Sequence, residues 1–170
     1  NPEDLFEEFK RDQLIEDTIV KGQNMVLFGY GFSGSGKSYT LLTAENNLTQ
    51  QIINYVDNKI TKVEFKELYP VEETKDQHDF QIIDDYNSII GNDITFKQIQ
   101  EKLKTVEIER KKNLRISPTT NNPESSRSHL FIVIKFDNDG QLTIVDMAGA
   151  HKNGTFETSE GTLQYQQEME

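Results

Sequence analysis

A glycine-rich octapeptide at residues 31–38, GFSGSGKS, constrains the fold of this 170-residue chain more than any other feature. It fits the pattern Gly-x-x-x-x-Gly-Lys-Ser/Thr, in which glycines let the backbone approach a phosphate group and the lysine brings a positive charge to it. The apolar run at residues 24–30 reads as a buried strand, and residues 38–42 read as the start of a helix. Strand, glycine loop and helix in this order predict a phosphate-binding loop (P-loop) in an α/β layer fold.

The residue types in this loop indicate what each would contact. In loops of this pattern the lysine, here Lys37, reaches the terminal phosphates, and the hydroxyl after it, here Ser38, is a ligand of Mg²⁺. The alternative is a Gly/Ser-rich turn with a chance lysine, a match we expect in roughly one chain per few hundred of this length. The flanking strand and helix favour the phosphate site. The residues predicted to bind the nucleotide are Gly31, Ser33, Gly34, Ser35, Gly36, Lys37, Ser38 and Tyr39.

The composition argues against several other functions. The chain has no cysteine, which rules out disulfides, thiolate zinc sites and a cysteine nucleophile. Its net charge of −11 argues against a nucleic-acid partner, and the one dense basic stretch, at residues 110–112, is interpreted as the solvated end of a helix. No apolar run approaches membrane-spanning length and no secretory leader is visible, so no membrane partner is predicted. Because the first residue is Asn1, we expect further chain before it.

The spacing of apolar residues predicts alternating helices and strands. Because strands alternate with helices, the fold class is α/β, and a hairpin turn at residues 137–140 adds an antiparallel pair, which makes the sheet mixed. Residues 72–79 and 117–124 are expected to be loops. We expect helices at residues 3–21, 48–60 and 96–112, the last capped by Thr95, and strands at residues 61–69, 80–83, 130–136 and 141–145.

A second motif follows the strand that ends at residue 145. Asp146 comes directly after this strand and begins a turn of small residues that contains Gly149. A nucleotide site needs an acidic residue at a strand end near Mg²⁺ and a loop that senses the terminal phosphate. The arrangement has the form of a Walker-B strand, with the Gly149 N–H free to meet the γ-phosphate. A strand that ends in a capped turn is the alternative, and the neighbouring P-loop favours the nucleotide site.

A third motif, NPESSRSH, occupies residues 122–129. It places three hydroxyls, an arginine and a histidine between a loop and a strand. Ser125 and Ser126 are candidates to orient Mg²⁺ or its waters, and Arg127 is a candidate to carry charge near the phosphate. The alternative is a serine-rich turn with an arginine at the strand edge, and composition alone does not choose between the two.

Taken together, the three motifs resemble those of the kinesin motor domain. The family P-loop AYGQTGSGKTYTM is similar to residues 28–41, its switch I motif N-x-x-S-S-R-S-H is matched in full by residues 122–129, and its switch II motif D-L-A-G-S-E is matched in part by residues 146–151. All three occur in the family's order, and the chain is therefore identified as a member. Smaller similarities occur at residues 22–24, residues 63–69 and Thr119.

The resemblance implies a fold, a chemistry and a partner. The fold would be a P-loop NTPase of kinesin type with a mixed, mostly parallel central sheet flanked by helices, of which residues 1–170 form roughly the middle half. The chemistry would be microtubule-stimulated ATP hydrolysis with Mg²⁺. Tubulin and other protein subunits would be the partners, in the cytoplasm and cytoskeleton, with cilia among the candidate locations. The catalytic residues implied are Ser125, Ser126, Arg127, Asp146 and Gly149, and the Mg²⁺ ligands are Ser38, Ser126 and Asp146.

One departure from the family bears directly on activity. In kinesins the switch I arginine, here Arg127, pairs with a switch II glutamate, but this chain has His151 at that position. A neutral histidine cannot pair with arginine as a carboxylate does, and a charged one repels it. Two functions follow: a working motor, or a hydrolysis-impaired subunit with a structural role. A register shift that lets Glu157 or Glu160 substitute is less favoured, and a P-loop small-molecule kinase or GTPase leaves the switch I motif unexplained.

Further departures concern the ends of the chain, its charge and its loop. The family's first strand, with the adenine-contacting R-x-R-P motif, and its main microtubule-binding helix are expected outside residues 1–170. Phe32 and Ser33 replace the usual Gln-Thr of the P-loop. The net charge of −11 suits the acidic surface of tubulin poorly, because like charges slow association.

Overall fold

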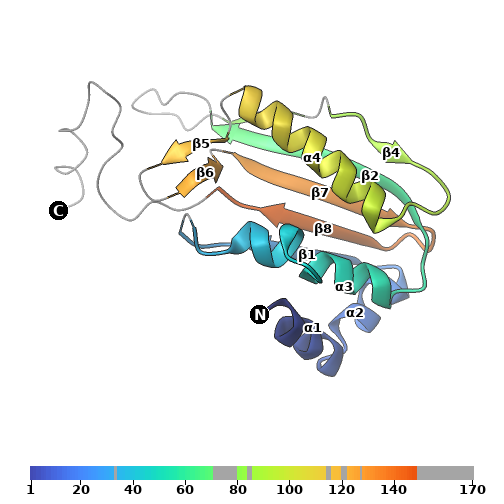
Figure 1. Cartoon of the computed structure of the whole chain (residues 1–170). Coiled ribbons are helices and arrows are strands. Elements are labelled where there is room, and N and C mark those ends of the chain that lie inside the picture. Colours follow the sequence, from blue (N-terminus) through green and yellow to red (C-terminus); the bar gives the residue numbers. More distant parts are fainter. Residues whose placement is uncertain are drawn as a thin grey trace, which may run out of the picture.

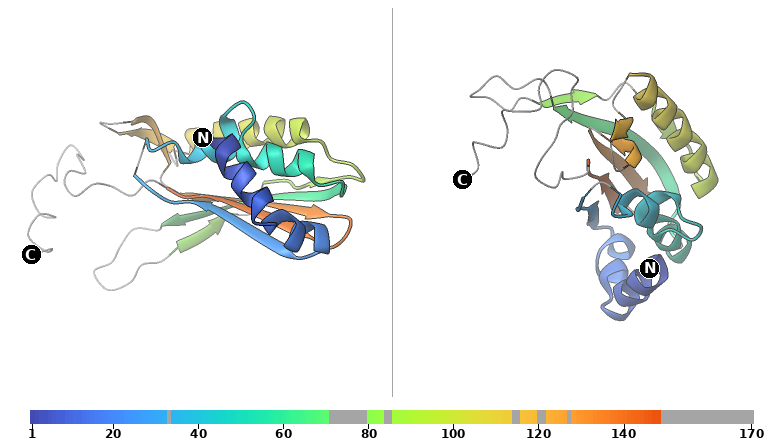
Figure 2. Two further views of the ribbon diagram at one scale, coloured as in Figure 1. Left: turned by 90° about the horizontal axis from the view of Figure 1, so that it is seen from below. Right: turned by 60° about the vertical axis from the view of Figure 1, so that its left-hand side comes forward.

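The computed structural model describes residues 1–32, 34–70, 80–83, 86–113, 116–119, 122–126 and 128–148. At its centre is a six-stranded sheet in the order β1-β8-β7-β2-β3, with β4 paired to β2. Helices α3 and α4 lie on one face of the sheet, and α1 lies next to α3 (Figure 1 and Figure 2). The strands are β1 (Asn24–Gly29), β2 (Ile60–Pro70), β3 (Phe80–Ile83), β4 (Ile89–Ile90), β7 (His129–Phe136) and β8 (Gln141–Asp146).

The sheet is mixed, as predicted, and the α/β class is confirmed. Among the described strand pairs of this sheet, β1 and β8 are parallel, whereas β2–β3, β2–β4, β2–β7 and β7–β8 are antiparallel. The share of parallel pairs is therefore smaller in this part of the chain than predicted. The β7–β8 pair is antiparallel because a tight turn joins the two strands, where Asp139 has a φ of 66°, and a short turn can join only antiparallel neighbours.

The helical segment before the P-loop is broken into three pieces rather than one helix over residues 3–21. They are α1 (Pro2–Arg11), α2 (Leu14–Asp17) and a 3₁₀ turn (Ile19–Lys21). The break comes at Gln13, whose φ of 56° lies in the left-handed region and redirects the chain. After the break, Ile15 and Ile19 are fully buried in the core.

Helix α4 (Phe96–Lys112) begins as predicted, because Thr95 and Gln98 form a reciprocal capping box. Helix α3 (Leu48–Tyr55) ends earlier than predicted. Its C-cap, Val56, has extended backbone angles, and Ile60 already begins β2. The apolar residues between 56 and 60 therefore enter the core from a connection and a strand, which hydrophobic spacing alone does not distinguish from a helix.

Two further strands occur where we expected a loop. Strands β5 (Ile116–Thr119) and β6 (Asn122–Ser126) pair antiparallel, with Ile116 opposite Ser126. The prediction of a loop was wrong for residues 117–119 and 122–124, and residues 120–121 lie outside the described residues. Backbone hydrogen bonds form this ribbon, and its polar sequence lacks the apolar alternation that identifies a strand.

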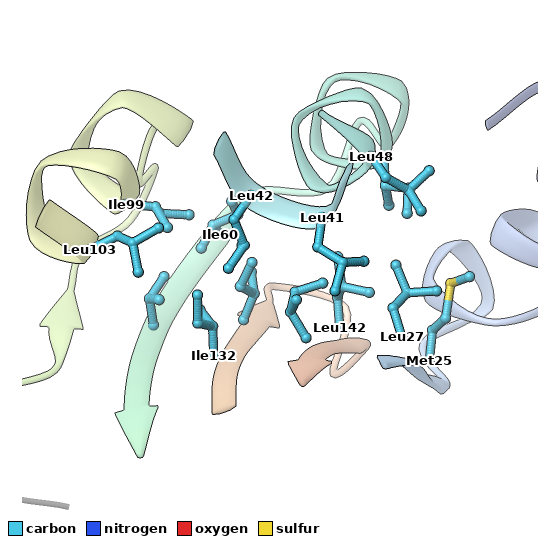
Figure 3. Close-up of a cluster of buried hydrophobic side chains, with 14 of the residues drawn as sticks. Met25, Leu27, Leu41, Leu42, Leu48, Ile60, Ile99, Leu103, Ile132 and Leu142 are labelled. Carbon is cyan, nitrogen blue, oxygen red and sulfur yellow. The ribbon is translucent and has the colours of Figure 1, made fainter. Parts of the chain in front are cut away.

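Apolar side chains from the sheet and from the helical layer meet between the two (Figure 3). Alternate residues of β7 point into this space, so the strand has one buried face. Burying one large apolar side chain, such as leucine or isoleucine, stabilises the fold by about 1.5–3 kcal/mol. Buried members include Leu27 and Leu142 from β1 and β8, Leu48 from α3, and Ile99 and Leu103 from α4.

The start of β1 depends on a glycine. Gly22 has a φ of 73°, and a Cβ built there would lie 2.6 Å from the Asn138 carbonyl oxygen. We expect Gly22→Ala to destabilise the protein by about 2 kcal/mol or more, because the left-handed conformation alone costs a residue with a Cβ roughly 1–2 kcal/mol. Urea unfolding measures the loss. The control is Gly91→Ala, where φ is not left-handed and the nearest atom is 3.3 Å away; equal losses in the two variants would contradict this account.

Candidate nucleotide-binding site

The P-loop connects β1 to a helical segment that begins at Lys37 and continues as a π-helical turn (Tyr39–Thr43). The predicted helix start after the loop is thus helical, with π geometry. Gly31, Gly34 and Gly36 have positive φ values of 146°, 78° and 85°. A Cβ at Gly34 or Gly36 would meet nothing within 4 Å, so the backbone conformation and not packing requires glycine there. Successive backbone N–H groups in such a loop form a concave site for anions.

The side chain of Lys37 closes this loop. Its Nζ donates to the carbonyl oxygens of Gly31 at 3.0 Å and Phe32 at 2.9 Å. Partial burial lowers the pKa of Lys37, and the negative charge of Asp146 opposes that effect. The positive charge predicted to meet phosphate therefore lies inside the loop and faces the acidic strand end.

The P-loop meets the Walker-B strand through Ser38 and Asp146. The Ser38 Oγ donates to Asp146 Oδ2 at 2.7 Å, although the two residues are 108 positions apart. The parallel pairing of β1 with β8, which places Gly29 opposite Asp146, brings the two ends to one edge of the sheet. Strand ends at such an edge are where α/β folds place ligands.

The surroundings of Asp146 fit a cation. The residue is 5% exposed, and its second oxygen, Oδ1, is buried without a hydrogen-bond partner. Burial raises the pKa of Asp146, while the hydrogen bond from Ser38 and the charges of Arg110, Lys37 and His129 oppose the rise. A serine hydroxyl beside a carboxylate with a spare oxygen is a donor set that Mg²⁺ accepts. Within the described residues, no group of three or more His, Cys, Asp or Glu side chains forms another candidate metal site.

A pocket of about 460 Å³ lies beside the P-loop. Leu5 and Phe9 of α1 line it together with Phe28 and residues of the P-loop itself. In the same region Tyr39 is 62% exposed. The pocket joins an apolar wall to the phosphate loop, a combination typical of small-molecule sites.

The structure describes only some of the predicted site residues, and their roles stay predictions. It brings Lys37, Ser38 and Asp146 together, and Ser125 and Ser126 are part of strand β6. Four of the residues singled out in the sequence, Ser33, Arg127, Gly149 and His151, lie outside the described residues.

The second and third motifs meet at His129. Its Nδ1 accepts a hydrogen bond from the Ala148 N–H at 3.2 Å, so the end of the serine-rich motif contacts the turn after Asp146. An imidazole that accepts at Nδ1 is neutral and carries its proton on Nε2.

We expect NMR titration to find the pKa of His129 below its ordinary value of about 6.5. Burial lowers it, and the positive charge of Arg110 lowers it further, against the opposing charge of Asp146. Because the folded state binds this proton less readily than the unfolded state, the contribution of His129 to stability is present above the unfolded pKa and is lost as pH falls. In the His129→Gln variant this pH-dependent loss should disappear. A pKa at or above the ordinary value would contradict the contact.

Sequence reasoning missed a buried ionic cluster behind this motif. Arg110 was interpreted as a solvated helix end, but it is 2% exposed and its Nε donates to Glu67 Oε1 at 2.7 Å. That prediction was wrong. The spacing held the signal, since Arg110 continues the buried stripe of α4 that contains Ile99, Leu103 and Val106.

Comparison with known proteins decides the family. Residues 2–169 match the family described as Kinesin motor domain. The chain belongs to the kinesin motor domain family. As a kinesin motor domain it has the P-loop NTPase fold predicted from its motifs. None of the helices in its described ranges combines the length and apolar content needed to cross a membrane.

The relatives are distant and much longer. The chain is 26% identical over 181 residues to Kinesin-like protein KIN-14I of Oryza sativa, a match that covers 88% of this chain and 14% of that protein. It is 26% identical over 186 residues to Kinesin-like protein KAR3 of Saccharomyces cerevisiae, a match that covers 88% of this chain and 25% of that protein. Its fold resembles a solved structure of KIF14 with ADP in complex with a microtubule, with a TM-score of 0.52, 18% identity, and coverage of 82% of this chain and 50% of that one.

Proposed function

We propose that this chain is the nucleotide-binding part of a microtubule motor that couples the hydrolysis of ATP to movement. The observation that supports this best is the contact between Ser38 Oγ and Asp146 Oδ2 at 2.7 Å, together with the unpaired and buried Asp146 Oδ1. A hydroxyl from a P-loop and a carboxylate from a neighbouring strand end are the parts that hold Mg²⁺ beside a nucleoside triphosphate.

Each residue of the proposed site has a role that its chemistry allows. Lys37 would hold the terminal phosphates and Tyr39 would contribute to the nucleotide pocket, while the backbone of the P-loop surrounds the phosphate oxygens. Bound Mg²⁺ would neutralise charge on those oxygens. The proposed Mg²⁺ ligands are Ser38, Ser126 and Asp146. The proposed sensors of the terminal phosphate are Ser125, Ser126, Arg127 and Gly149, and Ser33 is proposed to bind nucleotide as part of the P-loop.

The proposed partner is the microtubule. The KIF14 structure with a similar fold contains ADP and a microtubule, which supports tubulin as a partner of this chain. The proposed location is accordingly the cytoplasm and its microtubule cytoskeleton, cilia included, and association with other protein subunits is part of the proposal.

A second candidate is a kinesin that binds nucleotide and hydrolyses it slowly or not at all. The observation that favours it is His151, which stands where kinesins have the switch II glutamate. In this case the protein would serve in the architecture of a larger assembly.

The two candidates can be separated by restoring the carboxylate. In the full-length protein, the hydrolysis-impaired candidate predicts that His151→Glu raises ATP turnover by about tenfold or more, because a charge-assisted hydrogen bond contributes roughly 1.5–3 kcal/mol. A working motor predicts little change in this variant. Turnover is measured by phosphate release on microtubules. The matched controls are Glu157→Gln and Glu160→Gln, which lower turnover only if one of these residues already substitutes for the glutamate. Unchanged turnover in the His151→Glu variant would contradict the view that this position limits hydrolysis.

A further inference from the structure

In the last turn of α4, the positively charged side chain of Arg110 is buried in the interior of the protein. Arg110 donates from Nε to Glu67 Oε1 at 2.7 Å, and from Nη2 to the Ser128 carbonyl oxygen at 3.2 Å and the Ser128 Oγ at 3.0 Å. The side chains of Arg110 and Glu67 are 2% and 0% exposed. The guanidinium of Arg110 is thus hydrogen-bonded both to Glu67 in β2 and to Ser128, the residue that immediately precedes β7.

The same carboxylate receives two further hydrogen bonds. The Ser128 hydroxyl donates to Glu67 Oε1, and the Tyr86 hydroxyl donates to Glu67 Oε2 at 2.8 Å. Ser128 is fully buried and stands between Arg127 and His129 in the serine-rich motif. The cluster therefore fixes both the backbone and the side chain of the position at which this motif joins the sheet.

The cluster also reaches the strand end at the proposed metal site. His129 follows Ser128 and accepts the Ala148 N–H, so one chain of contacts runs from α4 to the turn after Asp146. Burial raises the pKa of Asp146 and lowers the pKa of His129, and the positive charge of Arg110 opposes the first shift and adds to the second. Stability alone does not explain such a group, because a buried ion pair generally stabilises a fold no more than apolar residues of the same volume.

We propose that Arg110 is a positioning residue, which sets the placement of the switch I segment, residues 122–129, against the nucleotide site. It acts through Ser128 and Glu67 and touches no nucleotide. This role rests on the proposed function, since switch I matters only if nucleotide binds. Arginine is needed because its fork can bond a carboxylate and a backbone carbonyl at once, whereas lysine offers a single point charge.

The experiment compares Arg110→Lys, Arg110→Met and the exposed neighbour Lys112→Met in the full-length protein. We measure thermal melting, native-state hydrogen exchange of the amides at residues 122–130 and 146–148 without nucleotide, and binding of a fluorescent ADP analogue. We expect the melting temperature of Arg110→Lys to stay close to that of the parent. Hydrogen exchange in these two segments should nevertheless rise by about tenfold or more. Binding of the ADP analogue should change less than about threefold in Arg110→Lys, because the hydrogen bonds described for Arg110 go to Glu67 and Ser128 and not to the described residues of the P-loop. Where the protein hydrolyses ATP, kcat should fall with KM unchanged.

Each outcome decides the question. Local exchange that rises in Arg110→Lys while Lys112→Met matches the parent supports a positioning role. The proposal is wrong if Arg110→Lys matches the parent both in melting temperature and in hydrogen exchange at residues 122–130 and 146–148. It is also wrong if exchange in Arg110→Met rises evenly over the core. In either case the residue serves charge balance alone. The exchange measurement needs no turnover, so an inactive protein would count against the proposed function and leave this test intact.

Discussion

The Asp146→Asn variant should lose at least about 100-fold of its Mg²⁺-dependent affinity for nucleotide, because removing one charge from a hard-cation site removes most of the attraction for Mg²⁺. The same variant should be more stable than the parent in the absence of Mg²⁺. Asp146 is buried with one oxygen unpaired, and burial raises the pKa of its carboxyl. A neutral amide costs less to bury than a carboxylate. We expect a gain of about 1 kcal/mol, or roughly 2–4 °C in melting temperature.

The pH dependence of that gain has a definite sign. Because the folded-state pKa of Asp146 is raised, the folded protein binds this proton more readily than the unfolded chain, and the contribution to stability is present at low pH and lost as pH rises through the folded pKa. The gain from Asp146→Asn should therefore be larger at neutral pH than at pH values below about 4. Melts in EDTA and titrations of fluorescent ADP with and without Mg²⁺ measure the two effects. The control is the exposed Asp57→Asn; a loss of stability in Asp146→Asn at neutral pH would contradict the account.

The Glu67→Gln variant should show the largest loss of stability. Removing this carboxylate leaves the Arg110 guanidinium buried without its counter-charge, a change that typically costs about 3–5 kcal/mol. Denaturant unfolding measures the loss. The matched control is Glu64→Gln on the same strand, whose ion pairs with Lys62 and Lys135 are partly exposed and should contribute less than about 1 kcal/mol.

A double variant tests whether the loss comes from the unpaired charge. Combining Glu67→Gln with Arg110→Met should recover more than half of it, because no buried charge is then left alone. Additive losses would contradict the ion-pair explanation.

The pH dependence supplies a second test of Glu67. Burial alone would raise the pKa of this carboxyl, but the hydrogen bond from Ser128, the charge of Arg110 and the hydrogen bond from Tyr86 lower it on balance. A lowered carboxyl pKa gives stability that is present above the unfolded pKa and lost as pH falls through the folded pKa. The stability difference between the parent and Glu67→Gln should therefore shrink in acid.

The parts of the fold that sequence reasoning predicted are those set by short-range signals. The strand before the P-loop, the capped start of α4 at Thr95 and the hairpin before β8 each depend on residues within a few positions of one another. The meeting of Ser38 with Asp146 was predictable because Ser38 follows β1 and Asp146 ends β8, and such folds place ligands at the ends of neighbouring strands.

The missed features depend on tertiary packing. The left-handed turn at Gln13 lets Ile15 and Ile19 reach the core, and no residue near it is a conventional helix breaker. The ribbon of β5 and β6 forms from backbone pairing in a polar segment. The spacing along α4 indicates that Arg110 is buried, but it does not identify the partner, Glu67, which lies 43 residues away.

The most direct test of the central claim is ATP turnover by the full-length protein, with and without polymerised microtubules, beside a Lys37→Ala variant that lacks the P-loop cation. We predict turnover that rises on microtubules and disappears in Lys37→Ala, which would also show that His151 is compatible with hydrolysis. Turnover that stays at the level of the Lys37→Ala variant with microtubules present would contradict the motor function and leave the hydrolysis-impaired subunit as the function of this chain.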